Sequence, residues 1–334
     1  MSVLDTIRAL AKADPKHIAM AEGADPRIVE GSLRAVREGL AQVTLIGPEA
    51  QVHAAVAAGG GRPDEVRVVD PETAPQCASY AARYEELRKH KGVTADQAAQ
   101  AMQNPLAFAA MMVRQGDAHG TVGGAVATTA DTLRADLQII GLAPGVGTVS
   151  SFFIMVLDQL HHPKQDVLAF ADCALVIDPS ADEMAQIAVA TARSYQALTE
   201  QAPRVAMLSF STAGSAKHER VEKVADATRL ASERAPELTI GGELQFDSAF
   251  VPSVGRSKAP GSPVAGDANV FVFPSLEAAN IGYKIAQRIG GAKAIGPILQ
   301  GMAQPANDLS RGCSADDVYN MIAVTGVQAA RAQG

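Results

Sequence analysis

The sequence has no tryptophan, and aromatic residues make up only 4% of its 334 positions. A buried core must therefore consist mainly of alanine, valine, leucine, isoleucine and methionine. Hydrophobic residues reach 47% and charged residues 19%, which is the composition of a folded globular protein and excludes a disordered chain. Because 334 residues are many for a single core, we expect two domains.

Cysteine is also scarce. Cys77, Cys173 and Cys313 lie far apart in the sequence and have no metal-binding spacing. Their odd number argues against a disulfide framework and favours a reducing compartment. Residues 1–12 predict an amphipathic helix without the apolar core of a signal peptide, and no stretch has about 18 uninterrupted apolar residues. We therefore expect a cytoplasmic protein with no membrane partner.

An excess of basic charge is missing as well. The net charge of −7 argues against a nucleic-acid partner, because such binding normally requires a basic surface. No G-x-G-x-x-G follows a predicted strand, and Ser209–Lys217 has the composition of a phosphate loop without the spacing of a nucleotide-binding one. An anionic substrate would thus need a local group of arginine and lysine side chains.

What the sequence does contain is an alternation of short apolar runs and helical patterns. His17–Ala21 and Val43–Gly47 predict strands, and Arg27–Glu38 predicts a helix between them. The alternation restarts after Gly141–Gly147. This spacing is typical of parallel sheets, so we expect an α/β protein of two doubly wound domains. The default ligand site of such a protein is the cleft between its domains.

Residues 305–317 concentrate polar chemistry, with the sequence Pro-Ala-Asn-Asp-Leu-Ser-Arg-Gly-Cys-Ser-Ala-Asp-Asp. An apolar helical pattern follows, and Ser314 and Asp317 have the spacing of a capping box. A turn that leads into a helix N-terminus favours anions, and Arg311 adds a planar group suited to phosphate. Helix capping and surface ion pairs explain the same residues one at a time, whereas their grouping beside glycine favours function.

Two other stretches carry the same ambiguity. Glu85–Gly92 ends a helix with several cations, including Arg88, which either complement the helix dipole or bind a phosphate. A helix is predicted over 133–142, and the residues near its start have two possible roles. They either begin the helix in an ordinary way or form a hydroxyl-rich anion cradle: Thr128, Thr129 and Arg134. Residues 255–270 form a long loop rich in proline and glycine, and loops of this length are usually functional or mobile.

Taken together, these stretches resemble the phosphate acetyltransferase (phosphotransacetylase) family. The matching segments run in the same order along the chain: 86–92, 130–134, 206–212, 242–245, 257–266 and 307–314. The resemblance implies reversible acetyl transfer, acetyl-CoA + phosphate = CoA + acetyl phosphate, with coenzyme A as a substrate and no permanently bound cofactor. It also implies a homodimer with a fold similar to isocitrate/isopropylmalate dehydrogenase. The first domain would comprise residues 1–146 plus 297–334, and the second residues 147–296.

The resemblance also assigns roles to residues. Asp317 matches the base that removes the thiol proton of coenzyme A, and Ser310 and Arg311 match residues that hold the acyl phosphate and stabilise the oxyanion. Arg88 and Arg134 match arginines that bind substrate phosphates. The remaining substrate-binding candidates are Thr128, Thr129, Asn307 and Cys313.

The chain departs from the family pattern beside the hydroxyl run. Ala127 stands where relatives commonly have histidine or asparagine, and Ala135 replaces the usual proline. Thr128 and Thr129 replace a run that is richer in serine in some relatives. Because these positions border the expected acyl-phosphate pocket, they bear on acyl preference and rate more than on reaction class.

Proton transfer from the thiol to an aspartate is unfavourable unless the site shifts the pKa values of the two groups. A thiol with a pKa of about 8.5 is only about 3% thiolate at pH 7, and an ordinary aspartate is a weaker base by about 4.6 units, or about 6 kcal/mol. Burial of Asp317 and a cation such as Arg311 beside the thiol would reduce this difference. Phosphate is a good leaving group, so the reaction demands no metal. Cys313 could carry the acyl group at a helix N-terminus, but direct transfer in a ternary complex is simpler.

Three alternatives remain open at this point. A metal-dependent decarboxylating dehydrogenase shares the expected fold, but Asp247 is the only suggestive acid near a matching strand. A non-catalytic CoA- or metabolite-sensing module predicts the loss of Ser310, Arg311 or Asp317, and all three are present. A phosphate butyryltransferase differs only in acyl chain, which rates on acyl-CoAs of different length would separate.

Overall fold

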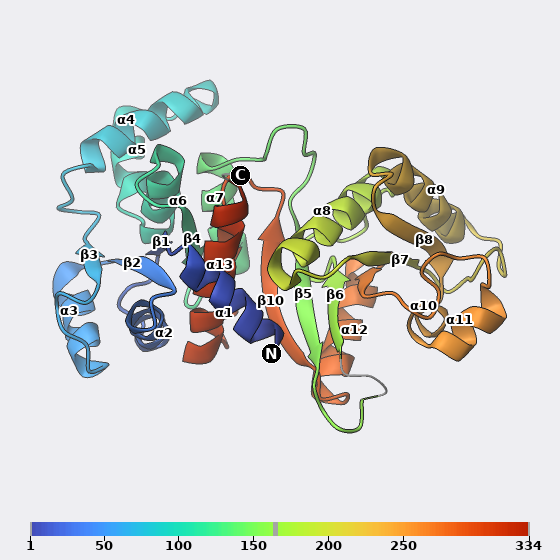
Figure 1. Ribbon diagram of the computed structural model, residues 1–334. Helices are drawn as coiled ribbons and strands as arrows, with labels where there is room; N and C mark the ends of the chain where they lie inside the picture. Colours follow the sequence, from blue (N-terminus) through green and yellow to red (C-terminus); the bar gives the residue numbers. More distant parts are fainter. Residues whose placement is uncertain (1, 163–165, 333–334) are drawn as a thin grey trace. The chain divides into compact units, whose positions relative to one another are not determined.

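The computed structural model describes residues 2–162 and 166–332, and its chain forms two compact units (Figure 1). The first unit comprises Met1–Pro144 and Met302–Gly334, and the second comprises Gly145–Gly301. The second unit therefore extends past the predicted boundary at residue 296. The reason is that residues 297–300 belong to strand β10 (Lys293–Gln300), which pairs with β5 of the second sheet.

The first unit contains a sheet of five parallel strands in the order β11-β4-β1-β2-β3. The strands are β1 (Lys16–Met20), β2 (Ala41–Ile46), β3 (Arg67–Val69), β4 (Gly120–Gly123) and β11 (Ala306–Asp308). The described helices are α1 (Val3–Ala13), α2 (Pro26–Arg37), α3 (Glu49–Ala58), α4 (Cys77–Arg88), α5 (Ala95–Met102), α6 (Pro105–Gln115), α7 (Thr129–Ile139) and α13 (Ala315–Ala332), with a 3-10 turn η1 (Lys89–Lys91).

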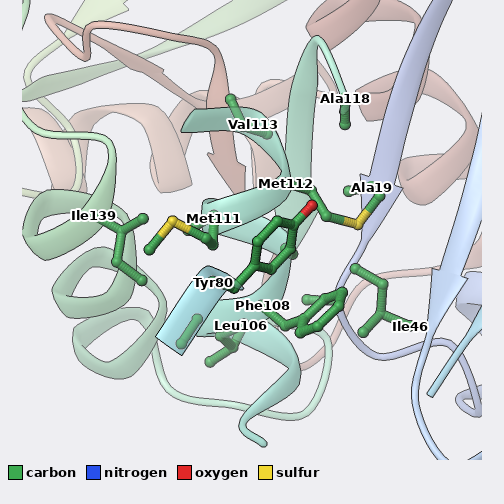
Figure 2. Close-up of a cluster of buried hydrophobic side chains, with 14 of the residues drawn as sticks. Ala19, Ile46, Tyr80, Leu106, Phe108, Met111, Met112, Val113, Ala118 and Ile139 are labelled. Atoms are coloured by element: carbon green, nitrogen blue, oxygen red, sulfur yellow. The ribbon is translucent and has the colours of Figure 1, made fainter. Parts of the chain in front are cut away.

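Helix α6 forms the core on one face of this sheet. The Asn104 side chain caps its first turn by accepting hydrogen bonds from the N–H groups of Leu106 (2.9 Å) and Ala107 (3.3 Å). Figure 2 shows its buried side chains Phe108, Met111 and Met112 among Ala19, Ile46 and Tyr80 from neighbouring elements. The core lacks tryptophan and uses methionine and alanine to fill the space, as the composition predicts.

Helix α13 covers the opposite face. Successive strand residues point to opposite sides, so Ile18 of β1, which pairs with Gly120, faces away from the cluster around α6. A Cβ on Gly120 would lie 2.6 Å from the Thr325 methyl group of α13, and one on Gly31 would lie 2.8 Å from Val318. Glycine at these positions lets α13 approach both the sheet and α2, and this fixes where the N-terminus of α13 lies.

The second unit has a mixed sheet in the order β10-β5-β6-β9-β7-β8. Strands β6, β9, β7 and β8 run parallel, whereas β5 is antiparallel to both β6 and β10. The sheet is thus less uniformly parallel than the sequence suggested. The described elements are β5 (Ser150–Leu157), β6 (Asp166–Ala171), β7 (Arg204–Leu208), β8 (Thr239–Leu244), β9 (Val270–Val272), α8 (Ala181–Thr199), α9 (Glu219–Arg234), α10 (Phe246–Phe250), α11 (Pro252–Lys258) and α12 (Leu276–Arg288).

Some local predictions differ from the structure. Helix α7 begins at Thr129 rather than at 133, because Thr128 caps it while the first turn lacks large apolar residues. The expected loop 255–270 begins inside α11. No helix in the described part of the chain is long and apolar enough to cross a membrane.

Candidate active site

The candidate site residues of the sequence analysis all belong to the first unit, and most lie in two loops at the carboxyl edge of its sheet. Strands β4 and β11 are parallel neighbours, with Gly123 opposite Asp308. The segments that follow them, 124–128 and 309–314, therefore start side by side. In open α/β sheets, ligands bind at this edge.

The N-terminus of α13 has the predicted capping box. The Asp317 carboxylate accepts hydrogen bonds from the Ser314 N–H (2.8 Å) and hydroxyl (2.9 Å), while the Ser314 oxygen accepts the Asp317 N–H (3.2 Å). The Asp317 side chain is exposed within this unit, so the burial that would strengthen it as a base is not provided by its own surroundings. Neighbouring Asp316 is bound to Arg34 (2.6 Å).

Ser310 and Arg311 are both exposed at the tip of the second loop. The Ser310 hydroxyl oxygen accepts the Gly312 N–H (3.2 Å), which leaves its own hydrogen available to a ligand. Among the residues that the structure describes, none forms an ion pair with the Arg311 guanidinium. An unpaired, exposed arginine beside a hydroxyl group and a helix N-terminus is a favourable binding site for a phosphate or carboxylate.

Arg27 holds the two loops together, a role that no local pattern in the sequence indicates. Its guanidinium donates to the carbonyl oxygens of Arg311 (2.7 Å) and Ala125 (2.7 Å), one from each loop. Asp25 holds Arg27 in place through a salt bridge (2.9 Å). Its side-chain hydrogen bond with Arg27 lowers the pKa of Asp25. In the sequence, Asp25 and Arg27 flank Pro26 and look like an ordinary helix start.

The first loop ends in a hydroxyl pair. Thr128 caps α7 by accepting the Asp131 N–H (3.2 Å), and its hydroxyl donates to the Asp131 carboxylate (2.7 Å). Arg134 binds the same carboxylate (2.7 Å) and remains 61% exposed. The hydrogen bond from Thr128, followed by that from Arg134, lowers the pKa of Asp131. The neighbouring hydroxyl of Thr129 points elsewhere and donates to Asp308 (2.6 Å).

Glu22 organises the backbone of the same loop and was also missed from sequence. Its carboxylate accepts three consecutive N–H groups, from Ala125 (2.6 Å), Val126 (3.0 Å) and Ala127 (2.7 Å). Beside it lies a pocket of about 560 Å³ with mainly apolar walls. The pocket is lined by residues after β1 and β2, by the start of α6 and by Val126 and Ala127. Its polar groups include two carboxylates, so its chemistry suits an uncharged ligand group better than a phosphate.

Two predicted residues have surroundings that favour a structural role. The Asn307 side chain is fully buried and donates to the Thr325 hydroxyl (2.9 Å) and the Gln328 side chain (2.7 Å), both on α13. Cys313 is buried, and burial raises the pKa of its thiol although Arg27 acts in the opposite direction. Desolvation outweighs the neighbouring positive charge, which argues against the less favoured possibility that Cys313 carries the acyl group.

Arg88 lies apart from the two loops, at the C-terminus of α4. Helix α4 contacts α7, where the Tyr84 hydroxyl donates to Gln138 (3.0 Å), so Arg88 and Arg134 belong to neighbouring helices. The Nε atom of Arg88 is buried and has no hydrogen-bond partner. A buried donor without a partner is costly, and a bound anion would supply an acceptor for the same guanidinium.

In the described ranges, residues 2–162 and 166–332, no group of three or more histidine, cysteine, aspartate or glutamate side chains could hold a metal ion. The available binding groups are thus arginine guanidinium groups, hydroxyl groups and backbone N–H groups. Together with a parallel sheet, these groups are those of an α/β protein with a site suited to a small anionic ligand.

Comparison with known proteins narrows this class to one family. Residues 2–326 match the family model described as "Phosphate acetyl/butaryl transferase". A phosphate acetyltransferase of Paracoccus denitrificans is 50% identical over 329 residues, which cover 98% of this chain and 99% of that protein. A crystal structure of a phosphotransacetylase from Streptococcus pyogenes superimposes with a TM-score of 0.93 at 41% identity and covers 98% of both chains.

The chain therefore belongs to the phosphate acetyl/butaryl transferase family, and its function is that of a phosphate acetyltransferase. The fold of this chain also occurs outside the family. A 4-hydroxythreonine-4-phosphate dehydrogenase from Klebsiella pneumoniae superimposes with a TM-score of 0.52 at 13% identity over 94% of this chain, a likeness of fold alone. The dehydrogenase-like α/β architecture expected from the sequence is thus confirmed.

Proposed function

We propose that the chain transfers an acetyl group reversibly between acetyl phosphate and coenzyme A, by direct attack of the CoA thiolate while both substrates are bound. The observation that carries this proposal is the unpaired Arg311 guanidinium beside the exposed Ser310 hydroxyl. These groups lie on the loop that Arg27 ties to the segment leading to Thr128. An acyl phosphate bound there would have cationic and hydroxyl donors on adjacent loops.

The proposed roles follow from the charge of each step. Arg311 binds the phosphate oxygens of acetyl phosphate, and Arg134 and Arg88 contribute further positive charge from α7 and α4. As the thiolate attacks the acetyl carbon, the carbonyl oxygen becomes negative, and Ser310 and Arg311 donate hydrogen bonds to it. The tetrahedral intermediate then collapses by breaking the carbon–oxygen bond to phosphate. Phosphate leaves with the electron pair, and acetyl-CoA remains.

Asp317 is the proposed acceptor of the thiol proton. Its carboxylate already accepts two hydrogen bonds from Ser314, which fix its position at the first turn of α13. An ordinary aspartate is about 4.6 pKa units too weak to deprotonate an ordinary thiol fully. The guanidinium of Arg311 would reduce this difference by stabilising the thiolate, so the two residues act as a pair.

The test is phosphate-dependent release of CoA thiol from acetyl-CoA, measured with EDTA present. Arg311→Ala and Asp317→Asn should each lower kcat/KM at least about a hundredfold, a loss near 2.7 kcal/mol. Asp316→Asn is the matched control, because Asp316 is an exposed acid on the same turn that is bound to Arg34 instead. If Asp317→Asn keeps full activity, Asp317 only caps the helix. A wild-type protein without activity on acetyl-CoA would refute the proposed function.

Acetyl is the proposed acyl group, because the curated relative at 50% identity is a phosphate acetyltransferase. The family model also includes butyryl transfer, and Ala127 lines the pocket beside the hydroxyl pair. We expect kcat/KM for butyryl-CoA to be well below that for acetyl-CoA. Ala127→Asn, which restores a residue common in relatives, should change the ratio of the two rates more than either Thr128→Ser or Ala135→Pro.

A homodimer is the proposed assembly, and helix α12 carries the supporting observation. Ile281, Ile285 and Ile289 are 57%, 54% and 83% exposed and follow one another at four-residue spacing. Glu277 and Arg288 are exposed at opposite ends of the same helix. Antiparallel pairing of two copies of α12 would cover the isoleucine stripe and bring each Glu277 to the Arg288 of the second copy.

Light scattering after gel filtration tests this assembly. Ile285→Glu should shift the protein from dimer to monomer at micromolar concentration. Leu160→Glu is the matched control, because Leu160 is 98% exposed in a loop outside α12. A wild-type monomer, or a dimer unaffected by Ile285→Glu, would contradict the proposed interface.

A cytoplasmic location completes the proposal. Cys77, Cys173 and Cys313 are free thiols, as expected in a reducing compartment. Fractionation of the producing cells should recover the protein with cytoplasmic markers, and recovery in the secreted or membrane fraction would contradict this location.

A further inference from the structure

Two buried carboxyl groups lie directly beneath the loops of the candidate site, and the proposed chemistry uses neither. Asp308 ends β11 and is 1% exposed, and Asp136 on α7 is 3% exposed. Asp308 Oδ1 and Asp136 Oδ2 are buried and have no hydrogen-bond partner in the described structure. Burial raises the pKa of Asp308 to about 6. Burial and the Asp308 charge raise the pKa of Asp136 well above its ordinary value.

Asp308 occupies a space that only glycine leaves open. Gly124, the first residue after β4, has a φ of +91°, and a Cβ there would lie 2.0 Å from Asp308 Oδ1. The neighbouring backbone is held as well, since the N–H of Leu309, the residue after Asp308, donates to the carbonyl of Gly123, the last residue of β4 (2.7 Å). The carboxyl group of Asp308 is therefore held rigidly between the two loops that carry the candidate residues.

Thr129 lies at the exposed start of α7, and its hydroxyl donates a hydrogen bond to Oδ2 of this carboxyl group (2.6 Å). A hydroxyl group has one hydrogen and two lone pairs. With its hydrogen directed inward, the exposed Thr129 oxygen can only accept a hydrogen bond from a ligand. A protonated Asp308 reverses this arrangement, because its O–H donates to Thr129 and the Thr129 hydrogen becomes free to bind a phosphate oxygen.

We propose that Asp308 is a positioning residue for acyl transfer, which sets the direction of the Thr129 hydroxyl toward the bound phosphate group. This inference rests on the proposed function. When Asp308 holds a proton, Thr129 donates to the phosphate oxygens. When Asp308 is ionised, Thr129 accepts instead and binds an anion less well. Asp308 thereby acts on the substrate only through Thr129.

The charged groups around Asp308 favour its protonation when an anion arrives. Asp136 lies on α7, and the Glu22 carboxylate raises the pKa of Asp308 further. Hydrogen bonds from Thr129 and Thr132 act in the opposite direction to burial and Glu22. A phosphate near Thr129 adds another negative charge, so its binding is coupled to uptake of a proton by Asp308.

The test compares the pH dependence of kcat/KM for acetyl phosphate between pH 5 and 8 in wild type, Thr129→Val and Thr129→Ser. The ratio of wild type to Thr129→Val cancels the ionisation of the substrate itself. We expect this ratio to be about ten at low pH, the value of one hydrogen bond, and to fall toward one above pH 6. Thr129→Ser should retain the wild-type profile. Because Thr129 is exposed, neither substitution threatens folding.

The second part of the test repeats these measurements in the Asp308→Asn variant. This substitution should remove the pH dependence of the ratio, and adding Thr129→Val to it should cost no more than Thr129→Val alone. Asp117→Asn is the matched control, because Asp117 also accepts a hydroxyl hydrogen, from Tyr80, but precedes β4 at the opposite edge of the sheet. That variant should keep the wild-type profile.

Three results would overturn the inference while leaving the proposed function intact: a pH-independent ratio, a Thr129→Ser variant that behaves like valine, or losses from Asp308→Asn and Thr129→Val that multiply. A wild-type protein that releases no CoA thiol in the presence of phosphate would overturn the proposed function and this inference together.

Discussion

Replacing Asp308 with asparagine should make the folded protein more stable at pH 8. Aspartate has an ordinary pKa of 3.8, and burial raises that of Asp308 to about 6. Between these values the folded chain holds a proton that the unfolded chain releases. The free energy of unfolding therefore falls as the pH rises through this window. At 1.36 kcal/mol per unit, the raised pKa of Asp308 lowers the free energy of unfolding by about 1 kcal/mol at pH 4.5 and by about 3 kcal/mol at pH 8.

Asparagine carries no charge and avoids this cost. Its amide forms a weaker hydrogen bond with Thr129, a loss of about 1 kcal/mol. The variant and the wild type should thus be equally stable near pH 4.5, and the variant should be more stable by about 2 kcal/mol at pH 8. Relief of the charge on neighbouring Asp136 acts in the same direction, because the charge of Asp308 raises the pKa of Asp136.

Equilibrium urea unfolding at the two pH values gives this difference, and hydrogen exchange of the β4 amides reports on the first unit alone. Asp131→Asn is the control of opposite sign, since hydrogen bonding lowers the pKa of Asp131. That variant should be less stable than wild type at both pH values, and this deficit should shrink only as the pH falls below the ordinary aspartate pKa of 3.8. If Asp308→Asn is less stable than wild type at pH 8, with the same gap at pH 4.5, the buried charge is not costly and the reasoning fails.

Three further substitutions test how the loops and α13 are held. Asn307→Ala should lower the free energy of unfolding by about 2 kcal/mol, because two hydrogen bonds are lost, and KM for acetyl-CoA should stay within about twofold. A large change in KM would instead support a role for Asn307 in substrate binding. Gly120→Ala should lower the free energy of unfolding, measured in urea, by about 1–3 kcal/mol, because its Cβ would meet Thr325. An unchanged free energy of unfolding would mean that α13 can move away from the sheet. Glu22→Ala removes the acceptor of three N–H groups, so KM for acetyl phosphate should rise about tenfold, and Glu22→Gln should have an intermediate KM. An unchanged KM would mean that the loop held by Glu22 does not contact the substrate.

The sequence predicted those parts of the fold whose signals are local. Ser314 and Asp317 mark the start of α13 because a capping box needs only four residues, and its hydrogen bonds form as expected. Asn104 followed by Pro105 marks the start of α6 for the same reason. Long apolar strands such as β5 were also predictable, since their pattern extends over eight residues.

Other parts depend on contacts between distant residues, which no local pattern reveals. Strand β11 has three residues and exists because it pairs with β4, so its Asn-Asp sequence looked like a polar loop. Arg27 binds Arg311, 284 positions away, and Glu22 binds residues 103 to 105 positions away. The resemblance to a family supplied candidate site residues, but burial separates them into two sets: Asn307 and Cys313 are enclosed, and Ser310 and Arg311 are exposed.

Glu22 and Asp308 differ in how well their negative charges are compensated, and this difference indicates that Asp308 has a role in ligand binding. Both carboxylates tie a loop of the site to the sheet. Glu22 does so with three backbone N–H donors, an arrangement in which the negative charge is well compensated. Asp308 has a hydroxyl donor, an unpartnered oxygen and another buried acid nearby. Asparagine would hold the same loops at lower cost, so a purely structural role does not account for an acid at this position. A group that gains and loses a proton when a phosphate binds does account for it, because only an acid can reverse the direction of the Thr129 hydrogen bond.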